Sequence, residues 1–166
     1  MLTKIAACSS LVIALAVLMA IFGFYPHEAA PVQPINFSHK LHAGDYKIDC
    51  AYCHTNARRS VVAGVPSMQL CMGCHKNVAK EKPEIQKLIR LWEQRRPIEW
   101  IKVNDLPDFV YFTHKRHIAA EVACQTCHGE VASMERVSKG RVLNMETCVN
   151  CHLERKASVD CWTCHK

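Results

Sequence analysis

The stretch Phe37-Ser38-His39-Lys40-Leu41-His42, followed by Cys50-Ala51-Tyr52-Cys53-His54, decides how this chain folds. The same pattern, F-x-H-x-x-H ahead of C-x-x-C-H, returns as Phe112-Thr113-His114-Lys115-Arg116-His117 ahead of Cys124–His128. In each case a second C-x-x-C-H motif follows, three residues after Met68 or Met145. The chain therefore contains an internal duplication, with repeats at residues 37–76 and 112–153 and a further motif at 161–165.

Five C-x-x-C-H motifs are present, and their spacing is typical of covalent c-type haem attachment. In that chemistry two cysteines form thioethers to the porphyrin, and the adjacent histidine binds the iron. The sequence therefore predicts five haems c. The attaching cysteines are Cys50, Cys53, Cys71, Cys74, Cys124, Cys127, Cys148, Cys151, Cys161 and Cys164, and the motif histidines are His54, His75, His128, His152 and His165.

Two other chemistries use paired cysteines. A zinc site can be built from two C-x-x-C pairs, but zinc does not require a histidine directly after the second cysteine. A disulfide scaffold is typical of small exported domains, but a two-residue gap makes a strained loop and leaves the histidines unexplained. The eleventh cysteine, Cys8, is expected to be a small buried residue. A sixth haem, attached in a non-standard way through Cys8 alone, is the other reading.

Five histidines lie outside the motifs, one for each predicted iron: His27, His39, His42, His114 and His117. An iron with imidazoles on both faces has no open position for a substrate. We therefore expect electron transfer and no catalytic residue in this chain. A multihaem reductase with an open iron is the alternative enzyme class, and the matched supply of histidines counts against it.

The F-x-H-x-x-H pattern places two histidines at positions i and i+3, on one side of a helix. We expect the first histidine of each pair to ligate the haem of the motif that follows it. The second histidine is expected to bind another, neighbouring haem. Met68 and Met145 are expected to pack on haem faces and not to bind iron, because the histidines suffice.

The N-terminal segment 1–26 is predicted to be a transmembrane anchor. No charged residue occurs from Ile5 to Tyr25, and 21 helical residues cover a hydrocarbon core of about 30 Å. Lys4 favours a cytoplasmic N-terminus. A cleavable signal peptide ending near Ala29–Ala30 is the alternative. The haem domain, residues 27–166, is then exported to the periplasm of a bacterium, at the inner membrane.

The predicted fold is mostly α-helical and irregular. A surface helix is expected at 82–95, with Pro83 in its first turn and Ile85, Leu88, Ile89 and Trp92 in one apolar stripe. That stripe packs on the haem domain or docks a partner subunit. Residues 97–112 are expected to run extended. Large apolar side chains are few, so the porphyrins are expected to supply much of the core.

The formal net charge of +6 does not indicate a nucleic-acid partner. Five haems would add about ten propionate charges and bring the loaded protein near neutrality or below. Arg58-Arg59 and Arg95-Arg96 are better explained as propionate partners or solvated surface. No aromatic residues are interleaved with the basic ones in the manner of a nucleic-acid site.

The two F-x-H-x-x-H…C-x-x-C-H units resemble class III cytochromes c. With the segment Pro97-Ile98-Glu99-Trp100…Asp105-Leu106-Pro107-Asp108-Phe109-Val110-Tyr111-Phe112, the chain is most similar to the membrane-anchored multihaem cytochrome subunit of alternative complex III and of the menaquinone reductase complex. The resemblance implies an iron–sulfur/molybdopterin-like subunit, an integral quinone-binding subunit and a soluble periplasmic cytochrome c as partners. It also implies a place in the respiratory chain.

The two complexes run in opposite directions: alternative complex III oxidises quinol, whereas the other complex reduces menaquinone. The compact chain favours the menaquinone reductase type, although relatives of that type carry a sixth haem and five motifs occur here. The anchored quinol dehydrogenase of periplasmic nitrate and nitrite reduction is a further alternative. Its first motif is followed by a methionine ligand, whereas His54 is followed here by Thr55-Asn56-Ala57.

Overall fold

The computed structural model describes residues 30–165, which are helical or irregular and form no β-strand. The elements, in chain order, are η1 (Lys40–Asp45), α2 (Cys50–Cys53), α3 (Met68–His75), α4 (Pro83–Glu93), α5 (His114–Ala119), α6 (Gln125–His128), η2 (Val131–Ser133), α7 (Met145–Glu154) and α8 (Cys161–Cys164). The mostly helical prediction is confirmed for this part. Within it, no helix combines the length and the apolar character needed to cross a bilayer. The predicted anchor, Cys8 and His27 lie outside the described residues.

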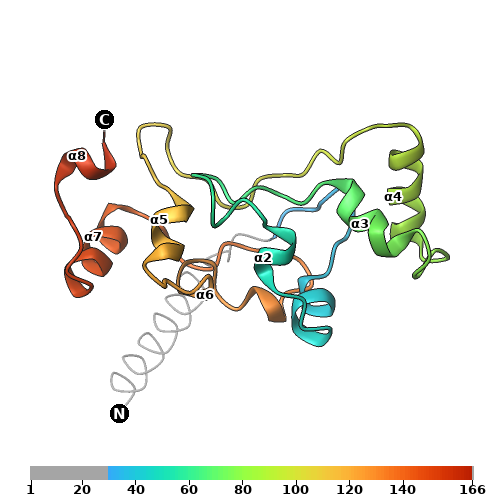
Figure 1. The fold of residues 1–166 in the computed structure, drawn as a ribbon, viewed down its shortest axis with the longest axis horizontal. Helices are drawn as coiled ribbons and strands as arrows, with labels where there is room; N and C mark the ends of the chain where they lie inside the picture. The colour runs from blue at the N-terminus through green and yellow to red at the C-terminus, as the bar shows by residue number, and fades with distance from the viewer. Residues whose placement is uncertain (1–29, 166) are drawn as a thin grey trace, which may run out of the picture.

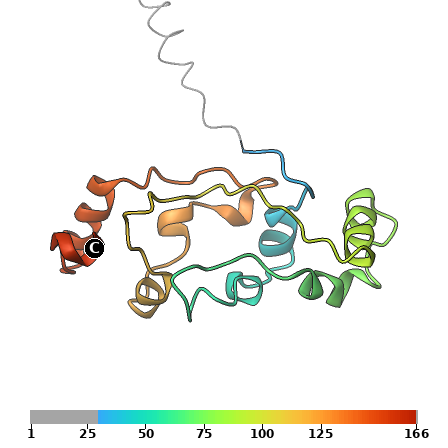
Figure 2. The same cartoon turned by 90° about the horizontal axis from the view of Figure 1, so that it is seen from above.

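The molecule is elongated, and its short helices are spread along the long axis (Figure 1). Helices α3 and α4 lie at one end, α2 and α6 in the middle, and α7 and α8 at the other end. The view from above shows the same order (Figure 2). The five helices that carry motif cysteines are therefore distributed from one end of the molecule to the other.

The two sequence repeats hold each other by matched backbone hydrogen bonds. At the start of η1, the Lys40 N–H donates to the Met134 carbonyl at 2.9 Å. At the start of α5, the Lys115 N–H donates to Ser60 and the His114 N–H to Val61, both at 3.1 Å. Each F-x-H-x-x-H helix thus begins on the segment that follows the first haem motif of the other repeat. The repeats are interlocked and do not form two separate units.

The first repeat has one extra residue after its second histidine, and a π-helix accommodates it. The Ile48 N–H donates to the His42 carbonyl six residues earlier, whereas the Val122 N–H donates to the His117 carbonyl five residues earlier, both at 3.0 Å. The longer turn makes η1 a π-helix while α5 stays an α-helix. Such π-turns are frequent at functional sites. The extra residue therefore lengthens the turn after His42, and the F-x-H-x-x-H spacing is the same in both repeats.

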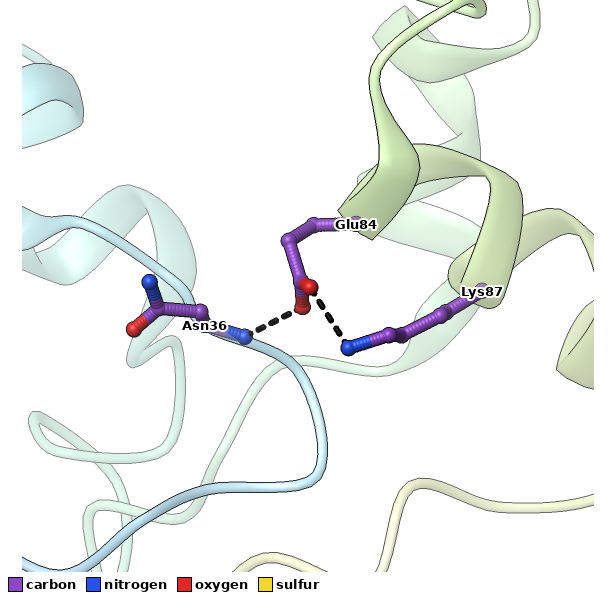
Figure 3. Close-up of polar contacts among 3 residues, drawn as sticks. All are labelled: Asn36, Glu84 and Lys87. Carbon is purple, nitrogen blue, oxygen red and sulfur yellow. Dashed lines mark hydrogen bonds and ion pairs between the residues drawn. The ribbon is translucent and has the colours of Figure 1, made fainter.

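Helix α4 matches the predicted surface helix at 82–95. Pro83 occupies its first turn, and Leu88 on the apolar stripe is buried, with 4% of its surface exposed. Helix α4 contacts α3. Glu84 in the first turn accepts hydrogen bonds from the Asn36 N–H at 2.7 Å and from Lys87 Nζ at 2.6 Å, and so ties the N-terminal segment to α4 (Figure 3).

The described residues bury very little apolar surface among themselves. Only Ile35, Ala57 and Leu88 are buried hydrophobic residues in this part of the chain. Many large apolar side chains are exposed, among them Tyr46, Tyr52, Val62, Phe109 and Trp162. A polypeptide of this length normally buries more than half of its surface. The protein part alone therefore lacks the core that would hold these helices together.

Candidate haem sites

The two cysteines of each motif lie within a helix, except that Cys124 is the N-cap residue of α6. Cysteines at positions i and i+3 share a helix face, so both sulfur atoms can reach one porphyrin edge. The N-cap residues start these helices: the Asp49 side chain accepts from the Ala51 N–H, and Asp160 from the Trp162 N–H. Asn144 and Thr147 form a reciprocal capping box on α7. Side-chain caps thus stabilise the starts of the four-residue helices α2 and α8 and of the longer α7.

The imidazole rings are oriented by hydrogen bonds at Nδ1. Seven of the nine described histidines have Nδ1 at 2.6–3.2 Å from a backbone carbonyl oxygen. The pairs are His42 with Ser38, His54 with Gly64, His75 with Val78, His114 with Val61, His117 with Thr113, His152 with Ser158, and His165 with Phe109. A carbonyl accepts only from a protonated Nδ1, so Nε2 keeps its lone pair for a metal. This donor set fits the iron of a c-type haem.

Three pairs of imidazoles lie close together, and each pair joins an F-x-H-x-x-H histidine to a motif histidine. The ring centroids are 6.1 Å apart for His42 and His75, 6.3 Å for His114 and His128, and 6.1 Å for His117 and His152. An imidazole nitrogen binds a metal at about 2 Å, so two rings with this separation could hold one metal between them. The spacing therefore accommodates one iron between each pair.

A fourth neighbourhood joins His39 to His54. Burial, together with the nearby His54 and His42, lowers the pKa of His39 to about 4. Among the described residues, its Nδ1 is the one buried side-chain nitrogen or oxygen atom without a hydrogen-bond partner. His165 is stacked on Phe109, with centroids 6.0 Å apart. The remaining predicted ligand, His27, lies outside the described residues.

The phenylalanine of each F-x-H-x-x-H pattern contacts both histidines of that pattern. Phe37 contacts His39 edge-on at 4.8 Å and His42 face-on at 4.4 Å, measured between ring centroids. Phe112 contacts His114 edge-on at 4.9 Å and His117 at 4.4 Å with the two rings tilted by 30°. One ring thus fixes the directions of both imidazoles, which lets two histidines three residues apart face different motif histidines.

The motifs form a row in which neighbours are close enough to affect each other's thiols. Burial raises the pKa of Cys71, as does the nearby thiol of Cys53. Burial and the Cys124 thiol raise the pKa of Cys50. Burial, then Cys151 and Cys148, raise the pKa of Cys127. The last motif joins through the 2.9 Å contact between Ser158 Oγ and Thr163 Oγ1. Along the long axis the motif helices follow one another as α3, α2, α6, α7 and α8, so the order of the motifs is two, one, three, four and five (Figure 1).

A groove of about 840 Å³ lies at the α3 and α4 end of the row. Arg95 and Arg96 line it together with the tryptophans Trp92 and Trp100, and Met68 lines it beside the second motif. Arg95 and Arg96 are exposed, which fits both a role as propionate partners and a solvated surface. Met145, the counterpart of Met68, is 70% exposed.

The sequence prediction missed the groups that orient the imidazoles. Most are backbone carbonyls, which carry no signal in a sequence. The exception is Asn104, whose side-chain amide lies 3.3 Å from the Nδ1 of His128. Burial, followed by the nearby His114 and His54, lowers the pKa of His128. The sequence pattern offered no reason to single out an asparagine between the repeats.

Comparisons with known proteins define the class. Residues 24–99 match the class III cytochrome c family, and residues 110–166 match cytochrome c7 and related cytochromes c. Together with the motif geometry, these matches identify the chain as a multihaem cytochrome c that carries c-type haems.

Similarity to one curated protein points to a particular respiratory complex. That protein is the multihaem cytochrome c subunit of menaquinone reductase from Nitratidesulfovibrio vulgaris, which is 27% identical over 161 residues. The match covers 81% of this chain and 77% of the relative. The resemblance predicted from the motifs and the linker segment is thus confirmed.

Proposed function

We propose that this protein is the electron-transfer subunit of a menaquinone reductase complex, with no catalytic site of its own. A bound c-type haem supplies reversible one-electron chemistry at its iron. The observation that carries the proposal is the set of facing imidazole pairs, because an iron held between two of them offers no position to a substrate. Similarity to the N. vulgaris subunit supports the particular complex.

The geometry supports a specific ligand set for five haems. His42 pairs with His75, His114 with His128, and His117 with His152, from the ring separations. We assign His39 to His54 because His54 is the motif histidine that contributes to the lowered pKa of His39, and because His75, the other motif histidine of the first repeat, lies beside His42. By elimination His27 pairs with His165, which leaves no motif histidine without a partner. Cysteine attachment follows the ten motif cysteines.

The row of motifs gives the subunit two distinct ends. Motif two lies at the α3 and α4 end, and motif five lies at the α7 and α8 end (Figure 1). Motifs one and three lie between them, where the two repeats interlock. Such a row allows one partner to donate electrons at one end and another to accept them at the opposite end. The polypeptide holds neighbouring haem sites close together, and its paired histidines leave no position at the iron for another ligand.

The surrounding complex follows from the same proposal. The domain at 27–166 lies in the periplasm and is held at the inner membrane by the segment 1–26 as a single-pass anchor. A soluble periplasmic cytochrome c donates electrons to it. An iron–sulfur/molybdopterin-like subunit and an integral quinone-binding subunit accept them and reduce menaquinone.

Direction of flow is tested in the purified complex by following haem absorbance after rapid mixing. We expect reduction by a reduced periplasmic cytochrome c to be faster than reduction by menaquinol, and subsequent oxidation by a menaquinone analogue. Faster reduction by menaquinol would instead support a quinol-oxidising role of the alternative complex III type.

Ligation is tested separately in the same preparation. The resting protein should give only low-spin ferric signals in electron paramagnetic resonance, and the reduced protein should not change its spectrum under carbon monoxide. A high-spin signal, or a carbon monoxide adduct in native buffer, would reveal an open iron and would contradict the relay proposal.

A further inference from the structure

One haem site differs from the others in what holds its motif histidine. His54, His75, His152 and His165 all have Nδ1 near backbone carbonyls, whereas His128 has the side chain of Asn104. The contrast is sharpest with its repeat counterpart, His54, which lies 2.6 Å from the Gly64 carbonyl. A backbone carbonyl cannot be changed by substitution, but a side chain can. The third motif therefore has an orienting group that depends on residue identity.

Asn104 is held in place from both sides. Upstream, the side chain of Gln33 makes two hydrogen bonds to the backbone of Ile101, each 2.9 Å long. Downstream, the Tyr111 N–H donates to the Cys164 carbonyl at 2.8 Å. The linker is thus fixed to the N-terminal segment and to the last motif. The amide reaches His128 from a segment that belongs to neither repeat.

The backbone of His128 is fixed independently of its ring. A Cβ added at Gly140 would overlap the carbonyl oxygen of His128, so the two backbones are in close contact. His128 and Asn104 are both half-buried. Since the backbone is already placed by Gly140, the contact with Asn104 acts on the imidazole itself.

The chemistry of the contact follows from iron binding through Nε2. The Nδ1 atom then carries a proton, so its partner must be an acceptor. The amide nitrogen is the Asn104 atom at 3.3 Å. The oxygen and nitrogen of an amide are assigned from the hydrogen-bond network, and a protonated Nδ1 requires the oxygen on that side. An acceptor at Nδ1 fixes the ring and makes the ligand more basic, which favours ferric iron.

We propose that Asn104 is a positioning residue for His128, and that its amide oxygen sets the reduction potential of the haem at Cys124–His128. The reduction concerned adds one electron to ferric iron, breaks no bond and leaves the Nδ1 proton in place. The inference rests on the ligand set of the proposed function. It adds that the linker between the repeats adjusts the central site of the row.

The test uses the haem-loaded full chain in its complex and two substitutions with opposite expected effects. Asn104→Asp keeps the size and supplies a stronger acceptor, so one midpoint potential should shift downwards. Asn104→Leu removes the acceptor, so the same midpoint should shift upwards. The other four components should keep their wild-type values. Redox titration followed by electron paramagnetic resonance resolves the components.

Two controls identify the site and the cause. Asp105→Asn removes a charge from the neighbouring exposed residue, which pairs with Lys102, and should leave all five potentials unchanged. His114→Met should move the same component that the Asn104 variants move, because His114 faces His128. Mass analysis of the peptide containing Cys124–His128 shows in every variant that the haem is attached.

The inference is overturned if both Asn104 variants keep the wild-type potentials, if all components shift together, or if Asp105→Asn gives the same shift. Should Asn104→Leu lose haem, Asn104→Asp decides alone. Absence of haem from the wild-type peptide would contradict the proposed ligand set instead, so the two failures are distinguishable.

Discussion

At the scale of single residues, the hydrogen-bond partner of each imidazole Nδ1 atom distinguishes one histidine site from another. Seven are near backbone carbonyls, one is near an amide side chain, and the Nδ1 of His39 has no partner within the described residues. Hydrogen bonding of this atom tunes the ligand, so chemically identical imidazole pairs need not have identical potentials. A relay of similar sites can acquire a gradient in this way, without changing any iron ligand.

Replacing one distal histidine by methionine should change a single site. In His117→Met we expect one haem to change from bis-imidazole to histidine–methionine ligation and its potential to rise, because thioether ligands favour ferrous iron. Magnetic circular dichroism and redox titration measure this change. Met145→Leu is the control and should leave every ligation unchanged. Loss of a methionine signature in that control would show that Met145 binds iron.

At the scale of elements, the close approach of η1 to η2 sets a strict size limit. A Cβ on Gly44 would overlap the carbonyl oxygen of Ala132, which belongs to the other repeat. The φ angle of Gly44 is not the reason, since glycines with positive φ occur instead at Gly64 and Gly129. The glycine is needed for space, at the point where the repeats interlock.

Gly44→Ala should therefore destabilise the haem-loaded protein by about 1–3 kcal/mol through overpacking. Wild-type protein loaded in parallel is the control, because Gly64 and Gly129 have positive φ, Gly73 lies inside the second haem motif and Gly140 is itself in close contact. Thermal unfolding followed by circular dichroism compares the two. Equal melting temperatures would contradict the proposed close approach.

Glu84 should contribute a pH-dependent part of the stability. The hydrogen bond from Lys87, then that from the Asn36 N–H, lowers the pKa of this carboxyl (Figure 3). A lowered pKa means that the contribution is complete above the unfolded-state pKa of about 4.3 and is lost as the pH falls through the folded value. Glu84→Gln should cost about 0.5–1 kcal/mol at pH 7, because the group is partly exposed.

The measurement for this substitution is the melting temperature of wild type and variant as a function of pH. The difference should be constant above about pH 5 and shrink below pH 4. Glu93→Gln, at the exposed end of the same helix, is the control and should show no such difference. A deficit for Glu84→Gln that persists in acid would mean that shape, and not charge, holds Asn36.

At the scale of the whole molecule, the missing apolar core is the dominant feature. Three buried hydrophobic residues among those described cannot offset the conformational entropy of ordering more than one hundred residues, at about 1–2 kcal/mol each for the backbone. We infer that the exposed aromatic and aliphatic side chains contact the porphyrins, and that the porphyrins supply most of the buried apolar surface.

Protein expressed without haem attachment should consequently be largely unfolded. Far-ultraviolet circular dichroism should show little helix, and heating should give no cooperative transition, because binding energy and folding energy are linked in such domains. Loaded protein prepared in parallel is the control. A native-like helical spectrum in the haem-free chain would show that the polypeptide has a sufficient core of its own.

Much of this organisation could be predicted from residue order alone. Covalent attachment depends on the local spacing of cysteine and histidine, so the five motifs predict haem wherever they occur. The duplication predicts equivalent helices, and the i, i+4 stripe around Leu88 predicts α4. These features are local, and a sequence displays them directly.

Other features required the tertiary structure. The reciprocal bonds at Lys40 and Lys115, the row of motifs, and the contact between Asn104 and His128 all join residues that are far apart in the chain. Backbone carbonyls, which orient most of the imidazoles, are the same in every residue and leave no trace in a sequence. The sequence by itself determined the kind of cofactor and its attachment, because those depend on nearest neighbours. Only the folded chain decided which histidines face each other and in what order the sites lie, because that depends on packing across the repeats.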